Sequence, residues 1–339
     1  MKVKKNIKPI NSPVVLSTTF SQDVPSQWGY SRVDDPTRLA LERELADLEK
    51  ANHALAFSSG SSAIACLFML LKAGDHILCH REIYEGTRRI LDKILKKFGL
   101  EFDLIDLKKI DEVKNKIRPS TKMIFFENIT NPNLDVINVK NITELAKKNN
   151  ILVAVDNTIC TPIFQKPLLE EADLVVHSLT KFISGHHDVL GGSIMTNNID
   201  LFERLKFNQQ TLGWVLSPFD CHLVSRGIKT LDIRMKKQTD SAFKIFNFLK
   251  NHKKIKKTNF PGVSGIISFT IGGKNTAKMF LKRLKSIKIA QSFGGVESTI
   301  LHPGSMMVLS SKIDDNFFRL SIGVEDPDLL INDLKEALK

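Results

Sequence analysis

The sequence predicts an α/β protein in which a mostly parallel sheet, covered by helices, is followed by a smaller α+β domain. Up to about residue 195 of the 339, short apolar segments rich in β-branched residues alternate with amphipathic helical stretches. Strands that are apolar along their whole length are typical of sheets buried on both faces, and the alternation indicates right-handed βαβ crossovers. A long helical stretch that starts near Arg234 changes this pattern and marks the second domain.

Seven apolar segments are predicted as strands of the large sheet: Ala54–Phe57, His76–Cys79, Phe102–Ile105, Lys122–Phe126, Ile151–Val155, Leu174–His177 and Ser193–Met195. Helices are predicted between them where apolar residues recur at helical spacing: Leu41, Leu45 and Leu48, the run from Ile90 to Leu95, and Val139–Lys148. In the second domain we expect a helix to about Asn251, a strand at Gly262–Ile271, a helix at Thr276–Leu284, a strand at Phe318–Ile322 and a closing helix after Asp326-Pro327.

The chain is thus predicted to have three parts: an N-terminal arm over residues 1–34, a large domain over 35–232 and a small domain over 233–339. The arm has little periodicity and contains Pro9, Pro13 and Pro25. Such a segment cannot bury itself, so it is either disordered or ordered against a partner, and its sequence favours the second.

Composition excludes several classes of protein. The longest apolar run, Ala63–Leu71, is far shorter than the roughly 20 residues that cross a bilayer. The charged start of the chain is followed by no long apolar stretch typical of a secretory signal, and the four cysteines show no C-x-x-C spacing. We therefore expect a cytoplasmic protein with reduced thiols, no membrane partner and no metal site.

The net charge of +12 raises the possibility of nucleic-acid binding. The basic residues are spread along the chain, however, and the dense cluster His252–Lys257 has no interleaved aromatic residues on which bases could stack. A solvated lysine-rich surface is the better interpretation, and we expect no nucleic-acid partner.

Polar residues follow several of the predicted strands, at the edge where open α/β sheets bind ligands. Ser58-Ser59-Gly60-Ser61-Ser62 leads from the first strand into a helix, where exposed N–H groups hold a phosphate or a serine simply caps the helix. Neither G-x-G-x-x-G nor a P-loop is present. Both interpretations of this turn remain open.

Two later strands end beside ionisable residues. Asp156 follows the fifth strand, either as a site residue or as a helix cap, and Lys181 follows the sixth, after the hydroxyl residues Ser178 and Thr180. A lysine partly desolvated in this place has a lowered pKa, which makes its neutral amine available as a nucleophile. An ordinary surface lysine is the alternative.

A series of motifs in this order resembles one family. They are Tyr30-Ser31-Arg32, Pro36-Thr37-Arg38, Ser58-Ser59-Gly60, Tyr84-Glu85-Gly86-Thr87, Asn131-Pro132, Asp156-Asn157-Thr158, Ser178-Leu179-Thr180-Lys181, Gly185 to Gly192, Leu216-Ser217-Pro218-Phe219, Arg226 to Leu231, Ser292 to Ser298, His302-Pro303 and Arg319 to Asp326. From about Ser17 onwards the chain resembles the cysteine/methionine-metabolism enzymes that use pyridoxal 5′-phosphate. This group includes the cystathionine γ-synthases and γ-lyases, cystathionine β-lyase and methionine γ-lyase. The resemblance implies a fold-type I, aspartate-aminotransferase-like structure.

The resemblance also implies the roles of individual residues toward the cofactor. Lys181 would attach the cofactor covalently and then move protons between substrate carbons, while Asp156 would pair with the pyridine nitrogen and Tyr84 would stack on the ring. The remaining residues of the implied cofactor site are Ser178, Thr180, Thr158 and the N–H groups of Gly60 and Ser61, together with Tyr30 and Arg32 from the neighbouring subunit. Lys181 and Tyr84 are the implied catalytic residues.

For the substrate, the resemblance implies that Arg319 binds the α-carboxylate as a bidentate fork, with Asn131 and Ser292 helping to orient it. Glu127 lies near the ring without an assigned role. His177, His186 and His187 are interpreted as packing residues, since no carboxylate or cysteine at metal-ligand spacing accompanies them.

Tyrosine usage supports these assignments independently. The chain contains 21 Phe and only two Tyr, and both tyrosines, Tyr30 and Tyr84, occur at motif positions. If these positions were only core aromatics, Phe would be the expected residue. This usage favours a role for the hydroxyl group at both positions.

Differences from the family pattern bear on the substrate. Gly29 and Gln291 stand where cystathionine γ-lyases and γ-synthases commonly carry acids, Gly86 replaces the cysteine typical of methionine γ-lyase, and Phe293 replaces the tryptophan of many β-lyases. The segment between Met306 and Phe318 is brief. We expect a trans-sulfuration enzyme acting at the γ-carbon of its amino-acid substrate, either cystathionine γ-synthase or γ-lyase.

Two alternatives remain open. One is an O-acyl-homoserine sulfhydrylase, and the other is a structural or regulatory homologue that binds the cofactor without catalysis. In either case the arm implies a homodimer with shared active sites, assembled into a homotetramer.

Overall fold

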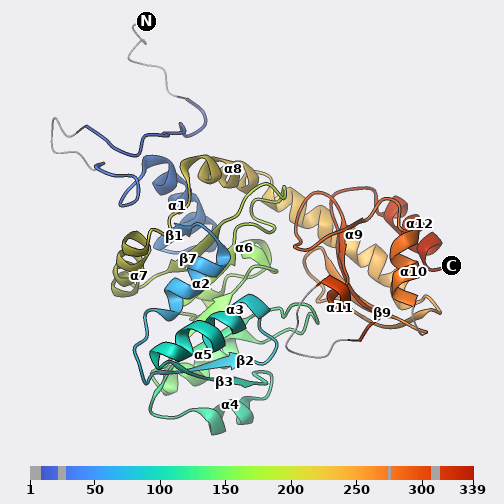
Figure 1. The fold of residues 1–339 in the computed structure, drawn as a ribbon, viewed down its shortest axis with the longest axis horizontal. Coiled ribbons are helices and arrows are strands. Elements are labelled where there is room, and N and C mark those ends of the chain that lie inside the picture. Colours follow the sequence, from blue (N-terminus) through green and yellow to red (C-terminus); the bar gives the residue numbers. More distant parts are fainter. Residues whose placement is uncertain (1–8, 22–27, 274–275, 307–313) are drawn as a thin grey trace, which may run out of the picture.

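The computed structural model describes residues 9–21, 28–273, 276–306 and 314–339. The arm is thus described only in part, without Pro25, and most of the segment between Met306 and Phe318 lies outside the described residues. Figure 1 shows a large α/β domain and, beside it, a smaller domain in orange and red that is joined to the first by a long helix. Within the described ranges no helix is long and apolar enough to cross a membrane.

The large domain is built on a seven-stranded sheet. Its strands are β1 (His53–Phe57), β2 (His76–His80), β3 (Glu101–Ile105), β4 (Thr121–Glu127), β5 (Leu152–Asp156), β6 (Leu174–Ser178) and β7 (Gly192–Thr196). They lie in the order β1-β7-β6-β5-β4-β2-β3. β7 is antiparallel to both β1 and β6, and the other neighbours are parallel. The predicted mostly parallel sheet is confirmed, with each strand within two residues of its expected bounds.

Helices cover both faces of this sheet (Figure 1). They are α1 (Pro36–Glu49), α2 (Gly60–Phe68), α3 (Glu85–Arg89), α4 (Ile110–Lys116), α5 (Val139–Lys148), α6 (Thr161–Phe164), α7 (Ile199–Leu212) and α8 (Pro218–Ile228). The Asp35 carboxylate caps α1 by accepting from the N–H groups of Thr37 and Arg38. The run from Ile90, expected as an ordinary helix, winds instead as a π-helix (Ile90–Ile94), followed by a 3₁₀ turn (Leu95–Phe98). A second 3₁₀ turn spans Pro167–Glu170.

Alternate residues of the strands pack into separate cores. On β6, Val175 packs in a cluster with Leu41 and Leu45 of α1, whereas Leu174 and Val176 pack with Leu67 of α2. Because successive strand residues point to opposite faces, a strand buried on both faces must be apolar at nearly every position. This explains the continuous apolar segments in the sequence.

The small domain begins with α9 (Leu231–Lys250) and contains a five-stranded sheet in the order β10-β11-β12-β9-β8. The strands are β8 (Ile255–Asn259), β9 (Ile266–Ile271), β10 (Lys288–Ile289), β11 (Thr299–Leu301) and β12 (Phe317–Ser321). The helices that complete it are α10 (Thr276–Arg283), α11 (Pro303–Met306) and α12 (Pro327–Ala337).

Three of these strands were not expected from the sequence. β10 and β11 are too short to show a period, and β8 begins inside the basic cluster interpreted as surface. Lys256 and Lys257 are indeed exposed, but on an edge strand, where lysines discourage pairing with other chains. The strand expected from Gly262 begins only at Ile266.

Helix α9 fixes the loops that carry the site. The buried guanidinium of Arg234 donates to the backbone carbonyls of Phe182 and Ile183, directly after Lys181. One turn later, the buried Gln238 amide donates to the carbonyls of Gly295 and Ile322 in the small domain. One helix thus holds backbone segments of both domains in place.

Candidate active site

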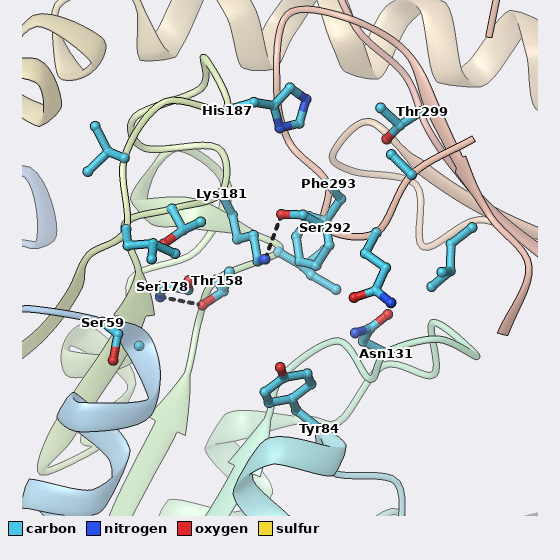
Figure 2. A pocket seen from close by; sticks show the side chains of 18 of the residues that line it. Ser59, Tyr84, Asn131, Thr158, Ser178, Lys181, His187, Ser292, Phe293 and Thr299 are labelled. Carbon is cyan, nitrogen blue, oxygen red and sulfur yellow. Dashed lines mark hydrogen bonds between the residues drawn. The ribbon is translucent and has the colours of Figure 1, made fainter. Parts of the chain in front are cut away.

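A cavity of about 910 Å³ lies where both domains meet the carboxyl ends of the parallel strands. Figure 2 shows Lys181, Ser292, Tyr84 and Asn131 extending into it from different segments. The residues predicted for the site that line it are Gly60, Ser61, Tyr84, Asn131, Asp156, Thr158, Ser178, Thr180, Lys181, Ser292 and Arg319. The fold therefore brings together eleven residues that are spread over most of the sequence.

The N-terminus of α2 forms one wall. Ser59 and Ser62 make a reciprocal capping box, each side chain accepting from the other's backbone N–H at 3.0 Å. The N–H groups of Gly60 and Ser61 have no acceptor among the described residues and lie at the cavity. A capped helix and an anion site therefore coexist in this turn, since the helix dipole and free N–H groups attract a phosphate.

Lys181 lies just beyond β6 at the centre of the cavity. Its Nζ donates to Ser292 Oγ at 2.7 Å and lies 5.1 Å from the centre of the Phe293 ring. Burial lowers the pKa of Lys181 to about 8, and the charge of Arg319 acts in the same direction while Asp156 opposes it. The predicted desolvated amine is present in the structure, and more of it is neutral near neutral pH than in a free lysine.

The hydroxyl residues around Lys181 bond to backbone. Thr158 Oγ1 accepts from the Ser178 N–H at 2.8 Å, and Thr180 Oγ1 accepts from the Gly191 N–H at 3.0 Å (Figure 2 shows the first of these bonds). These bonds connect the ends of β5 and β6 to the loop before β7. Ser178 itself lies beside Gly60, where an added Cβ would be 3.1 Å from the Ser178 Cβ.

Asp156 and Glu127 are the final residues of neighbouring parallel strands and are partners in register. Burial raises the pKa of Asp156, and the hydrogen bonds from Thr158 and the charges of His177 and Lys181 oppose this shift. Burial also raises the pKa of Glu127 well above its usual value, and the Asp156 charge adds to the effect. Two carboxyl groups thus share one edge of the cavity.

Tyr84 lies beside this edge and is 41% exposed, and its backbone N–H donates to Glu127 Oε1. A Cβ built on Gly86 would lie 2.3 Å from Cε1 of the Tyr84 ring. No side chain can therefore occupy position 86 while the ring keeps this place. With the Tyr84 ring in this place, position 86 has no room for the cysteine that is typical of methionine γ-lyase.

Arg319, on β12, lines the cavity from the small domain and is 4% exposed. It donates from Nη1 to Asn131 Oδ1 at 2.7 Å and from Nη2 to the Ser292 carbonyl, while its buried Nε has no partner. Burial lowers the pKa of Arg319 to about 10. Because no carboxylate pairs with this buried cation among the described residues, it is suited to an anionic ligand.

Tyr30 and Arg32 do not line the cavity. Arg32 donates to the Gln210 carbonyl of α7 at 2.6 Å, and its guanidinium lies 5.4 Å from the centre of the Tyr30 ring. The arm lies against α7 of its own chain instead. The expectation that these two residues serve a neighbouring subunit stays a prediction.

Several cavity residues were not predicted as site residues. Lys288 and Thr299 come from the short strands β10 and β11, and the exposed Glu297 from the loop between them. His187, interpreted as a packing residue, lines the cavity and lies so close to Gly295 that an added Cβ would meet its ring. Only packing against the second domain brings these residues to the site.

The residues present fit pyridoxal phosphate. Free N–H groups at a helix N-terminus match its phosphate, a carboxyl group matches its pyridine nitrogen, and an amine of lowered pKa matches its aldehyde. The unpartnered Nε of Arg319 then remains for the carboxylate of an amino acid.

Comparison with known proteins agrees with this fit. The model of the family described as "Cys/Met metabolism PLP-dependent enzyme" matches residues 1–339. The chain is 39% identical to cystathionine beta-lyase of Lactococcus lactis over 362 residues, covering 99% of this chain and 95% of the relative. It is also 39% identical to cystathionine gamma-lyase of Bacillus subtilis over 357 residues, covering 97% and 94%.

Among solved structures, metB from Corynebacterium glutamicum superposes with a TM-score of 0.95 at 38% identity, covering 99% of this chain and 94% of that one. The match over the full chain confirms the resemblance, the fold class and the cofactor implied by the sequence motifs. The chain belongs to the Cys/Met metabolism family of pyridoxal-phosphate-dependent enzymes.

Proposed function

We propose that this protein is a carbon–sulfur lyase that uses pyridoxal phosphate to cleave cystathionine at its γ-carbon. The observation that carries the proposal is the position of the Lys181 amine, which contacts Ser292 and lies beside the buried Arg319 and its partner Asn131. An amino acid whose carboxylate binds Arg319 would place its α-carbon within reach of this amine.

The residues have distinct tasks in this reaction. The bound cofactor supplies an electron sink that makes the protons of the α- and β-carbons acidic. Lys181 Nζ takes these protons in turn, which its lowered pKa permits near neutral pH. Ser292 Oγ accepts from Nζ and so orients it between the two carbons. Loss of the two protons lets the γ-carbon expel its thiolate.

The binding residues hold the reactants around this amine. Arg319 has Nε free for the substrate carboxylate, and its two other nitrogens are fixed by Asn131 and the Ser292 backbone. With the cofactor bound, Asp156 would hold the pyridine nitrogen and Tyr84 would hold the ring. Its phosphate would be held by the turn and strand ends that carry Gly60, Ser61, Thr158, Ser178 and Thr180.

The cleavage direction is proposed because the Bacillus subtilis relative is named cystathionine gamma-lyase and the Lactococcus lactis relative a beta-lyase. Cleavage on the γ side is preferred to the β side because Phe293 occupies the position of the β-lyase tryptophan. Its ring lies 5.1 Å from Lys181 Nζ and 4.9 Å from the Arg319 guanidinium.

Product analysis tests the proposal. Cystathionine given to the purified enzyme should yield cysteine, 2-oxobutanoate and ammonia. Pyruvate and homocysteine would mean β-cleavage, and cystathionine formed from activated homoserine and cysteine would mean synthesis. Homocysteine formed from activated homoserine and sulfide would identify a sulfhydrylase. No turnover by cofactor-loaded protein in any of these assays would favour the non-catalytic alternative.

We further propose that the enzyme is a cytoplasmic homodimer with shared active sites, assembled into a homotetramer. Tyr30 and Arg32 lie outside the cavity of their own chain, which supports a role in a neighbouring one. All four cysteines are free and buried, in keeping with a reducing compartment.

A further inference from the structure

Glu127 and Asp156 occupy equivalent positions at the ends of β4 and β5, where they are partners in register. Partners on neighbouring parallel strands lie about 4.8 Å apart and point to the same face of the sheet. Both residues line the cavity. The carboxyl groups therefore lie side by side at its floor.

Glu127 is 7% exposed and bonds to backbone rather than to a charged side chain. Its Oε1 accepts from the N–H of Tyr84, and its carboxyl group also accepts from the N–H of Asn131. Tyr84 follows β2, whereas Asn131 follows β4. One buried carboxyl group thus anchors two separate loops, each of which contributes a residue to the site.

The charges around the pair do not favour two ionised groups. Neither Glu127 nor Asp156 forms an ion pair with a cation within 4.0 Å in the described part of the chain. Glu127 faces the negative charges of Asp156 on β5 and of Glu82 after β2. The positive charges of His177 and Lys181 act on Asp156. Burial and these negative charges raise the pKa of Glu127 well above its usual value, against the two backbone N–H bonds that lower it, so a proton shared by the pair is held more readily by Glu127 than by Asp156.

We propose that Glu127 is a positioning residue that holds Tyr84 and Asn131 as a neutral carboxylic acid and leaves the negative charge of the pair on Asp156. The neutral acid keeps its acceptor oxygens for the two backbone N–H groups without placing a second charge beside Asp156. Asp156 is then the only ionised carboxylate facing the ring nitrogen of the cofactor. This assignment rests on the part of the proposed function that concerns the cofactor site. It does not depend on which substrate the enzyme uses.

The test compares Glu127→Gln with Glu127→Ala, and Glu144→Gln on the exposed face of α5 serves as a control. Glutamine keeps a neutral acceptor at position 127. The cofactor dissociation constant and the kcat/KM of Glu127→Gln should therefore stay within about threefold of the parent values. Alanine removes the acceptor and releases the loops that carry Tyr84 and Asn131. Glu127→Ala should therefore have a higher KM and a kcat/KM that is lower by more than about tenfold. Circular dichroism and thermal unfolding check that each variant is folded.

Infrared difference spectra of the holoenzymes provide a measure that is independent of activity. The parent spectrum at neutral pH should contain the carbonyl band of a protonated carboxylic acid that Glu127→Gln lacks and Glu144→Gln retains. Asp156→Asn should lower the pH at which this band disappears, because it removes the neighbouring negative charge.

Two results would overturn the assignment: a folded Glu127→Gln enzyme as impaired as Glu127→Ala, or a parent spectrum with no acid band assigned to Glu127. Failure of the lyase assay alone would leave the band and the cofactor affinity unchanged. It would therefore reject the proposed substrate and not the role of Glu127.

Discussion

The Nζ of Lys181 donates a 2.7 Å hydrogen bond to Oγ of Ser292, a residue 111 positions later in the chain (Figure 2). This bond joins the end of β6 in the large domain to the loop between β10 and β11 in the small domain. The same loop provides the Ser292 carbonyl that accepts from Arg319. The amine and the cation of the site are thus positioned by one residue, and the geometry of the site depends on how the two domains pack.

Lys181→Ala should abolish the visible absorbance of the covalently attached cofactor and all turnover. The fold should remain, because the N-terminus of α2 and Asp156 do not depend on the amine. Absorbance and borohydride reduction measure the attachment, and circular dichroism serves as the control. A variant that is still reduced by borohydride at the parent stoichiometry would contradict the assignment.

The lowered pKa of Lys181 should appear in the pH dependence of stability. In the folded apoprotein this pKa is about 8, against an ordinary value of 10.5 for lysine, so the protonated amine costs stability below pH 8. As the pH rises from 8 toward 10.5, the unfolded chain holds a proton that the folded chain has lost, and folding is increasingly favoured.

Relative to Lys181→Met, the free energy of unfolding of the parent apoprotein should therefore increase over this range by on the order of 2 kcal/mol. Urea unfolding at a series of pH values measures the difference, in which the titration of other lysines cancels. A difference that is flat with pH would show that Lys181 is not desolvated.

Arg32→Ala and Lys181→Ala should complement each other when the two proteins are mixed and their subunits exchange. If the arm reaches a neighbouring subunit, one site in each mixed dimer carries neither substitution, and part of the activity returns. Activity after mixing measures this, and exchange is verified with differently tagged chains. Absence of rescue despite proven exchange would place the role of Arg32 within its own chain, at its contact with Gln210.

Arg319→Ala should lower kcat/KM at least tenfold for every amino-acid substrate. Hydrogen bonds to a charged group contribute about 1.5–3 kcal/mol, and the α-carboxylate is common to all substrates. Steady-state kinetics with cystathionine and with an O-acyl-homoserine give the two ratios. A loss confined to one substrate would mean that Arg319 recognises the side chain instead.

Gln291→Glu should shift specificity toward cystathionine by on the order of 1 kcal/mol, or several-fold in relative kcat/KM, because a carboxylate pairs better than an amide with a distal ammonium. Gln291 is an exposed residue of the cavity wall, and its Nε2 donates to the Met306 carbonyl at 2.8 Å. The measured quantity is the ratio of kcat/KM for cystathionine to that for an O-acyl-homoserine. An unchanged ratio would show that position 291 does not face the distal amine.

Much of the large domain was predictable from the sequence. Strands such as β4 and β6 are buried on both faces, so their sequences are continuous apolar runs, and helix α5 begins and ends at the predicted residues. Asp156 and Lys181 were identifiable because parallel strands bring their carboxyl ends to one edge of the sheet. The motif order then identified the family and the cofactor.

Other features could not be read from any local pattern. The strands β10 and β11 are too short to have a period, and the sequence of β7 does not indicate that it runs antiparallel to its neighbours. The pairing of Glu127 with Asp156 depends on the register of β4 against β5. Register is a property of two strands together and is not encoded in either one.

The sequence by itself determined which segments are apolar and which ionisable and hydroxyl residues follow the strands. Only the tertiary structure decided that the Lys181 amine loses its solvent, that Phe293 lies near both Lys181 and Arg319, and that Tyr30 and Arg32 stay outside the cavity. The physical reason is that hydrophobic periodicity is local, whereas burial and electrostatic coupling depend on distances between segments that are far apart in the chain.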